Sequence, residues 1–486
     1  MNRRMIVSTL RKSLLAEGVL MLIPMLVSII YGEAFWPFAS VALGLIILGA
    51  IGKKKATFDE TIYSKEGFVI VGLVWIVWSA FGALPFVISG AIPNYIDAFF
   101  ETVSGFTTTG SSILTNIESL PMGMLFWRSF THWVGGMGVL VFISAIVPIA
   151  AGGRSMFILK AEMPGPAADK LVPKAKKTSQ ILYIMYLVLS LFEFLLLMLS
   201  DMPLFDSLVN TFGTAGTGGF AVKNAGIAAY ANPSAEIIMT VFMCLFSLNF
   251  SIYFLIIMRK FKTVLRNEEM WTFIGIFVLS TAAIVINIMN LPEYVGNTGD
   301  AVRAAAFQTS SIMSSSGFST VDFSNWPMFS QSLLLFLMFI GACAGSTGGG
   351  MKVVRFILAG KIMRRDLRKL VRPRNVEKVR MDGKVVEDNM LSGIKTYVLI
   401  YFAIVFGSFL ILSIEGKDII TTFSSVVTCF NNIGPGLGKL VGPAGNFFEW
   451  SYPAKIILSF NMLLGRLEIF PILVLLMPSL WKKKTL

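Results

Sequence analysis

Four short segments of the chain combine small polar residues with glycine in a way that could coordinate a cation. They read FFETVSGFTTTG, LVNTFGTAGTGG, AFQTSSIMSSSG and FSSVVTCFNNIG, and they end at Gly110, Gly219, Gly317 and Gly434. The residues two positions before these glycines are all small and polar: Thr108, Thr217, Ser315 and Asn432. Glycine adopts backbone dihedrals that can turn peptide carbonyls inward, and carbonyl oxygens can replace the hydration shell of an alkali cation. The segments therefore predict a cation site built from main-chain oxygens.

Other kinds of chemistry find little support in the sequence. The polar turns themselves hold no carboxylate, and a ring of carboxylates would suit a divalent cation, so a monovalent ion is favoured. Three cysteines and the lone His132 form neither a disulfide framework nor a zinc motif. A membrane-embedded enzyme would need paired carboxylates, a metal cluster or an activated nucleophile, and no such constellation is visible. His132 is best explained as a packing residue, with a ligand role as the alternative.

Each polar turn follows a short apolar stretch that we expect to be a helix. Aspartates stand where these helices should begin: Asp97, Asp206, Asp300 and Asp418. Aspartate is favoured at a helix N-terminus, where it caps free N–H groups and complements the dipole. A helix that enters the membrane halfway directs the negative end of its dipole at the bilayer centre, which favours a cation there. Four ordinary polar loops are the alternative, but the segments recur about every 100 residues, each between two long apolar spans.

Composition places these units in a membrane. Of 486 residues, 55% are hydrophobic and only 14% charged, and mean hydropathy is +0.73. A spanning helix needs about 20 mostly apolar residues. The sequence predicts spans at roughly 13–31, 35–51, 67–90, 121–150, 180–200, 234–258, 270–290, 327–360, 391–414 and 452–480.

The distribution of basic residues sets the orientation of these spans. Alternate connections and both chain ends hold 34 of the 41 lysines and arginines. Because basic residues collect in cytoplasmic loops, both termini are predicted to be cytoplasmic. The net charge of +13 then reflects membrane topology rather than a nucleic-acid surface.

The sequence thus predicts an all-α polytopic membrane protein in which four-fold pseudo-symmetric repeats of helix–pore loop–helix surround a central pore, with an added N-terminal helix pair. The expected divisions are residues 1–60 for the helix pair, 61–178 and 179–266 for pore repeats 1 and 2, 267–390 for repeat 3, and 391–486 for repeat 4. Repeat 3 includes the basic cytoplasmic stretch 360–395, which is either topogenic charge with lipid contact or a surface that a soluble partner could grip.

Two features near the predicted pore could control flow. The stretch GACAGSTGGG (341–350) interrupts the eighth span, and five glycines in ten residues are poorly helical. It could be an unwound plug below the filter or a tight helix crossing. Arg466 lies within the last span, where a charge usually faces a cavity. There it would repel cations, or it would form an ion pair with Glu193 or Glu468. Glu468 is a poor partner, because residues two apart on a helix do not share a face.

These motifs, together with HWVGGMG (132–138), GSTGGGMK (345–352) and GRLEIFP (465–471), resemble the TrkH/KtrB superfamily of bacterial potassium transporters. The added N-terminal pair is similar to the TrkH branch. The resemblance covers essentially the whole chain and implies a single-chain, pseudo-tetrameric pore in the bacterial cytoplasmic (inner) membrane. Potassium would be the transported ion, with no bound enzyme cofactor and no enzymatic activity. An ion-coupled, alternating-access symporter driven by H⁺ or Na⁺ remains the alternative, although such carriers usually show two inverted repeats.

The resemblance also assigns residues to roles. It implies a potassium filter made of Thr108, Thr109, Gly110, Thr217, Gly218, Gly219, Ser315, Ser316, Gly317, Asn432, Ile433 and Gly434, coordinating mainly through main-chain oxygens. It implies a gate made of Gly345, Ser346, Thr347, Gly348, Gly349, Gly350 and Arg466. Plant relatives with serine at the first filter glycine tend towards sodium, so Gly110 favours potassium. Two departures stand out: either Gly218 or Gly219 could be the aligned glycine of the second segment, and Pro435 replaces a bulkier or hydroxyl residue.

The same resemblance implies partners. The expected assembly is a homodimer of pore subunits with a TrkA-like cytoplasmic nucleotide-binding regulatory subunit, held in a lipid bilayer and binding no nucleic acid. The chain itself carries no P-loop, so any nucleotide effect would be exerted through the partner.

Overall fold

The structure is a computed structural model that describes residues 3–51, 64–138, 175–374 and 377–478, and these are mostly helical. Five of the described helical segments are long and apolar enough to cross a membrane, and a bent helix pair would make a sixth. The predicted fold class, a polytopic helical protein of four pore repeats with an added N-terminal pair, is confirmed.

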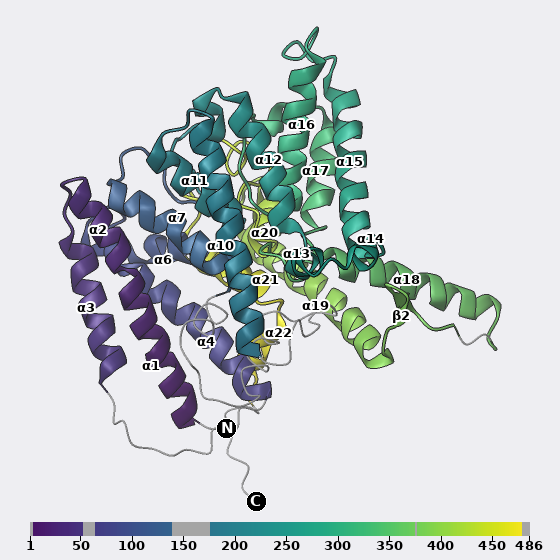
Figure 1. Cartoon of the computed structure of the whole chain (residues 1–486), viewed down its shortest axis with the longest axis horizontal. Coiled ribbons are helices and arrows are strands. Elements are labelled where there is room, and N and C mark those ends of the chain that lie inside the picture. Colours follow the sequence, from purple (N-terminus) through teal and green to yellow (C-terminus); the bar gives the residue numbers. More distant parts are fainter. Residues whose placement is uncertain (1–2, 52–63, 139–174, 375–376, 479–486) are drawn as a thin grey trace, which may run out of the picture.

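The N-terminal pair packs beside the first repeat, at the left of Figure 1. It consists of α1 (Arg3–Leu20), its continuation α2 (Leu22–Ile30) and α3 (Trp36–Ala50). Small residues allow the two arms to approach closely, since a Cβ on Gly18 would lie 3.0 Å from the Ala42 carbonyl oxygen. The Glu33 carboxylate, in the turn between the arms, accepts hydrogen bonds from the backbone N–H groups of Met122 at 2.7 Å and Gly123 at 3.0 Å. It thereby caps a helix of repeat 1 from outside that repeat.

Each repeat has an outer helix, a short pore helix and an inner helix. The outer helices are α4 (Ser64–Gly82) with α5 (Leu84–Ile88), α10 (Ala175–Leu199), α15 (Glu268–Ile288) and α19 (Asp388–Leu412). The pore helices are α6 (Tyr95–Phe106), α11 (Leu204–Gly216), α16 (Thr298–Met313) and α20 (Ile419–Phe430). The inner helices are α7 (Met122–Gly136), α12 (Pro233–Ser247) with α13 (Phe250–Ile257), α17 (Met328–Met338) with α18 (Val353–Val371), and α21 (Tyr452–Arg466) with α22 (Phe470–Leu476). Single-turn connections are η1 (Gly226–Tyr230), α14 (Phe261–Leu265), η2 (Phe323–Asn325) and η3 (Ser413–Glu415).

The N-termini of the pore helices differ from the prediction in one respect. Of the four aspartates, Asp418 is an N-cap, and its carboxylate accepts a hydrogen bond from the Thr421 N–H at 2.9 Å. The helices α6 and α16 are capped by Asn94 and Asn297 instead, and α11 begins after Pro203. The other three aspartates lie in the first helical turn, where they still complement the dipole.

Three predicted spans are broken, and only the break in the eighth span was expected. The span at 234–258 bends by 90° between α12 and α13. The span at 327–360 is interrupted by the glycine-rich stretch between α17 and α18, as its composition indicated. The span at 452–480 breaks where Glu468 and Ile469 both have positive φ, and this makes Arg466 the last residue of α21. Such breaks survive in a membrane only where protein or a water-filled cavity surrounds them.

The connection from repeat 3 to repeat 4 carries the antiparallel hairpin of β1 (Arg380–Met381) and β2 (Lys384–Val385). At the right of Figure 1, α18 projects from the helical body beside this hairpin. The predicted second half of the fourth span (139–150) and the basic residues in 53–55, 154–174 and 482–484 lie outside the described residues.

Candidate cation filter and gate

The four polar turns adopt the same backbone conformation. We call them row 1 (Thr108–Gly110), row 2 (Thr217–Gly219), row 3 (Ser315–Gly317) and row 4 (Asn432–Gly434). The first residue of each row is left-handed, with φ of 55–59°, and the last is a glycine with φ of 72–105°. The middle N–H of each row donates to the carbonyl five residues earlier, at distances of 2.8, 2.8, 2.9 and 3.0 Å. These are Schellman turns that end the pore helices, but with threonine, serine or asparagine at the left-handed position where glycine is usual.

The rows close into a ring. A Cβ on Gly110 would lie 2.0 Å from the carbonyl oxygen of Gly218, and one on Gly219 would lie 1.9 Å from that of Ser316. A Cβ on Gly317 would lie 1.8 Å from the Ile433 oxygen, and one on Gly434 would lie 2.9 Å from the Thr109 oxygen, which returns to row 1. Each row therefore presents its last glycine to the middle carbonyl of the next row. A side chain at any of these glycines would occupy the space of a neighbouring carbonyl.

This cyclic pattern aligns the second row. Gly219 has the positive φ and the neighbour contact that Gly110, Gly317 and Gly434 share, whereas Gly218 is the middle residue of its row. The extra glycine of this row, Gly218, has a steric explanation, because a Cβ at that position would lie 2.3 Å from the His132 ring. Pro435, the departure in row 4, packs against row 3, with its Cδ 2.9 Å from the Cβ position of Gly317.

The four glycines line a single cavity on the outer side of the ring, with a volume of about 150 Å³. Its wall also includes residues that follow the rows, such as Ser111, Phe318 and Pro435. The four turns are therefore gathered around one space rather than scattered. That their carbonyl oxygens bind potassium stays a prediction.

The glycine-rich stretch 341–350 lies against the inner side of rows 3 and 4; we call it the intramembrane loop. The Gly349 N–H donates to the Ser315 hydroxyl at 2.9 Å. Cβ atoms on Gly349 and Gly350 would lie 2.5 Å and 2.8 Å from the side-chain oxygens of Asn432 and Asn431. Side chains at these two positions would collide with Asn431 and Asn432. The loop therefore needs glycine in order to approach the turns, and not only because glycine disfavours a helix.

The break between α12 and α13 holds the other side of the intramembrane loop. The Cys343 N–H donates to the Ser247 oxygen at 2.9 Å, and the Phe250 N–H donates to the Gly345 oxygen at 3.0 Å. The Thr347 hydroxyl donates to the Phe246 oxygen at 3.2 Å. Backbone groups that a continuous helix would satisfy internally are therefore satisfied by the intramembrane loop. The predicted stretch 234–258 gave no sign of this break beyond its polar Asn249.

Arg466 joins the filter, the intramembrane loop and α7. Its Nη1 donates to the Thr347 oxygen at 2.5 Å and to the Thr108 hydroxyl at 3.1 Å. Its Nη2 donates to the oxygens of Gly135 and Gly136, each at 2.6 Å. Glu468, one of the two ion-pair partners considered for Arg466, pairs with Arg355. The arginine therefore lies directly against row 1.

Sequence reasoning missed several buried charges around the intramembrane loop. Lys352 and Arg355 were counted with the cytoplasmic basic residues, yet both are buried, and the Lys352 ammonium donates to the Gly348 oxygen. The Glu269 carboxylate accepts from the N–H groups of Ala344 at 2.7 Å and Val354 at 3.1 Å, and so spans both ends of the loop. The available signal was GSTGGGMK itself, where a lysine directly follows the glycines.

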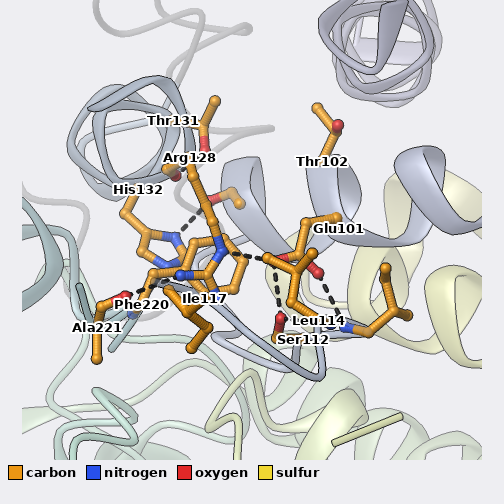
Figure 2. Close-up of polar contacts among 12 residues, drawn as sticks. Glu101, Thr102, Ser112, Leu114, Ile117, Arg128, Thr131, His132, Phe220 and Ala221 are labelled. Carbon is orange, nitrogen blue, oxygen red and sulfur yellow. Dashed lines mark hydrogen bonds and ion pairs between the residues drawn. The ribbon is translucent and has the colours of Figure 1, made fainter. Parts of the chain in front are cut away.

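Two further buried pairs hold the first pore helix, α6. Asp97 of α6 pairs with Lys455 of α21 at 2.7 Å, and Glu101 of α6 pairs with Arg128 of α7 at 2.5 Å. His132 is a packing residue, as expected: its Nδ1 is 2.7 Å from the Gly105 oxygen, and its Nε2 accepts from the Phe220 N–H at 3.3 Å. Figure 2 shows His132, Phe220 and Arg128 close together.

Four re-entrant pore helices, four matching turns and one shared cavity define a pore-loop protein of the membrane. The family model described as "TrkH: Cation transport protein" matches residues 38–483. The chain belongs to this family of cation transport proteins.

Relatives match along nearly their whole length. The Trk system potassium uptake protein TrkH of Salmonella typhimurium is 36% identical over 473 residues, covering 95% of this chain and 96% of the relative. The TrkH of Halomonas elongata is 33% identical and covers 99% of this chain and 100% of the relative. The crystal structure of the potassium transporter TrkH from Vibrio parahaemolyticus superimposes with a TM-score of 0.87 at 33% identity, covering 99% of this chain and 100% of that one.

Proposed function

We propose that this protein takes up potassium across the bacterial cytoplasmic membrane through a selective pore. The observation that carries the proposal is the closed ring of rows 1 to 4, in which each glycine abuts the middle carbonyl of the next row. Relatives at 36% identity are named Trk system potassium uptake proteins, which supports potassium as the transported ion. The chain acts as a transporter and not as an enzyme.

The filter selects through main-chain oxygens. In each row a left-handed residue and a left-handed glycine flank a middle residue of ordinary φ, and this alternation points successive carbonyls toward the same side. Carbonyls so aligned replace the water around a dehydrated cation. The C-terminal ends of four pore helices add negative dipole potential at the same place. Gly110 keeps row 1 free of a side chain, which favours potassium.

The intramembrane loop is the gate, and Gly345, Ser346, Thr347, Gly348, Gly349, Gly350 and Arg466 are its working residues. In the present arrangement the loop contacts rows 3 and 4, and Arg466 holds it beneath row 1. A cation passing the filter would meet the guanidinium before it could reach the cytoplasm. Conduction therefore requires the loop and Arg466 to move away from the axis.

Release of the loop is coupled to the break in α12–α13. In a continuous helix the Phe246 oxygen would accept from the Phe250 N–H, and the Ser247 oxygen from the Ser251 N–H. Here those four groups form hydrogen bonds instead with Thr347, Gly345, Cys343 and the Asn249 side chain. Unsatisfied backbone groups at membrane depth cost several kcal/mol each. Loop departure with closure of the helix break would keep all of them satisfied.

The protein functions as a homodimer together with a TrkA-like cytoplasmic nucleotide-binding regulatory subunit, with both termini in the cytoplasm. The names of the relatives refer to a Trk system, which supports regulatory partners. The end of α18 offers a surface for such contact, because Met363, Leu367 and Leu370 are exposed beside several arginines. The divisions at 60/61, 178/179, 266/267 and 390/391 are the proposed repeat boundaries.

Uptake of radioactive rubidium into proteoliposomes tests the function. The purified chain should accumulate rubidium along its own gradient, with unlabelled potassium competing better than sodium. Sodium and proton gradients are then varied separately. Uptake that depends on either gradient would replace the pore with the ion-coupled symporter, and an absence of rubidium uptake would overturn both.

A further inference from the structure

A buried cluster behind rows 1 and 2 joins the segments that leave the filter. We call residues 111–113, which follow row 1, the outer leg of row 1, and residues 220–221 the outer leg of row 2. The Glu101 carboxylate accepts from the Ser112 hydroxyl and from the Ile113 N–H, each at 2.9 Å. It thus holds the outer leg of row 1 from the middle of the first pore helix.

Arg128 connects this carboxylate to the outer leg of row 2. Its Nε donates to Glu101 at 2.5 Å, and its Nη1 donates to the Ala221 oxygen at 3.0 Å. Its guanidinium lies over the Phe220 ring at 3.6 Å from the ring centroid. Figure 2 shows the arginine between Glu101 on one side and Phe220 with Ala221 on the other. A planar group with several fixed donors can hold two backbone segments at a set separation, which a lysine cannot do.

His132 supports the same two rows one helical turn further along α7. Residues four apart lie on one helix face, so Arg128 and His132 reach the filter together. Because Nε2 accepts from the Phe220 N–H, the ring proton is on Nδ1 and is donated to the Gly105 oxygen, at the end of pore helix α6. The imidazole also packs against the Phe220 ring at a tilt of 34°, with 4.1 Å between ring centroids.

We propose that Glu101 and Arg128, with His132, form a clamp that fixes the separation of the outer legs of rows 1 and 2, and thereby sets the cation selectivity of the pore. The assignment rests on the proposed potassium transport. Burying two charges carries a desolvation penalty that apolar packing would avoid, so the pair is not explained by stability alone. Its contacts lie one to three residues beyond the filter glycines, where a small shift alters how closely the carbonyls approach the ion.

A measurement of cation selectivity distinguishes this positioning role from a general structural role. Three forms of the full-length protein are compared: Arg128→Met, Arg128→Lys and the doubly neutral Glu101→Gln/Arg128→Met. The control is Arg303→Gln, which breaks a partly exposed arginine–carboxylate ion pair between α16 and Glu236 of α12, at 2.7 Å. Rubidium and sodium fluxes are measured in proteoliposomes, and size-exclusion profile and melting temperature report folding.

The sodium-to-rubidium flux ratio should rise about tenfold in Arg128→Met and in the double variant, in line with the loss of a charged hydrogen bond. Arg128→Lys should give a smaller rise, and Arg303→Gln should keep the wild-type ratio. If Arg128→Met does not fold, the double variant, which leaves no unpaired charge, carries the test. A folded double variant and a folded Arg128→Lys with wild-type ratios would overturn the clamp alone, whereas a wild-type protein without rubidium flux would overturn the proposed function with it.

Discussion

Rows 1 and 2 share their backbone conformation with rows 3 and 4, yet the two halves of the ring are supported differently. The outer legs of rows 1 and 2 are held from behind by a buried ion pair, a histidine and an aromatic ring. The residues that directly follow rows 3 and 4, Phe318 and Pro435, are held by hydroxyls of their own pore helices. The Ser311 hydroxyl donates to the Phe318 oxygen at 2.6 Å, and the Thr428 hydroxyl donates to the Pro435 oxygen at 3.0 Å.

The two halves of the ring also differ on their inner sides. Rows 3 and 4 face the intramembrane loop, while row 1 meets the Arg466 side chain. The outer legs of rows 1 and 2 are thus held by side chains of α7, whereas the inner sides of rows 3 and 4 abut the intramembrane loop that we propose to move. A pseudo-symmetric pore built from one chain can divide selection and gating between its repeats, which four identical subunits cannot do.

The largest expected effect comes from the junction of the two halves. Gly219→Ala would place a Cβ 1.9 Å from the Ser316 oxygen at a φ of +72°. The left-handed dihedral alone costs about 1–2 kcal/mol, so rubidium uptake should fall by at least about tenfold. Gly275→Ala in α15, where a Cβ would meet no atom within 4 Å, is the matched control. Normal uptake by Gly219→Ala would mean that rows 2 and 3 do not share one ring.

Arg466→Ala tests the link between the halves. It removes the charged hydrogen bonds to the Thr347 oxygen and the Thr108 hydroxyl, each worth about 1.5–3 kcal/mol. We expect the basal rubidium flux in liposomes to rise about tenfold, since each 1.4 kcal/mol changes an equilibrium by that factor. Arg466→Lys keeps the charge but not the forked guanidinium, so its basal flux should lie between those of the wild type and Arg466→Ala. Unchanged or reduced flux would argue against Arg466 as a barrier.

Asn249→Ala tests only the half of the ring that contacts the intramembrane loop, which is rows 3 and 4. The side chain caps α13 at the break, accepting from the Ser251 N–H at 2.9 Å. Loss of an N-cap costs about 1 kcal/mol, which favours a continuous helix and should raise basal flux about fivefold. Asn232→Ala removes the cap at the other end of the same α12 and should leave basal flux unchanged. Equal effects of the two substitutions would contradict the coupling of the break to the loop.

The smallest effect is expected from Ser315→Ala. It removes the hydroxyl that accepts the Gly349 N–H, a neutral hydrogen bond worth about 0.5–1.5 kcal/mol. Basal flux should rise about threefold, with the sodium-to-rubidium ratio unaltered. Ser330→Ala, whose hydroxyl bonds Asn287 away from the filter, provides the comparison. A changed ratio without a changed flux would place Ser315 in selection rather than gating.

Much of the architecture followed from sequence because it depends on local chemistry. The apolar spans, the four polar turns and the glycine-rich interruption are each legible within about 20 residues. The pore-helix starts were placed within a few residues, but aspartate was identified as the cap where Asn94 and Asn297 serve. Asparagine and aspartate cap equally well, so only the backbone geometry distinguishes the cap from a first-turn acid.

The sequence by itself determined that the chain is a helical membrane protein with four copies of one polar turn, because burial in lipid and left-handed turns constrain residue types locally. The tertiary structure decided what those turns do to one another. It aligned Gly219 rather than Gly218, brought Arg466 to Thr347, paired Glu101 with Arg128 and fitted the broken helix α12–α13 to the intramembrane loop. These partners are far apart in sequence, and their pairing depends on how the repeats pack around the axis, which no local pattern records.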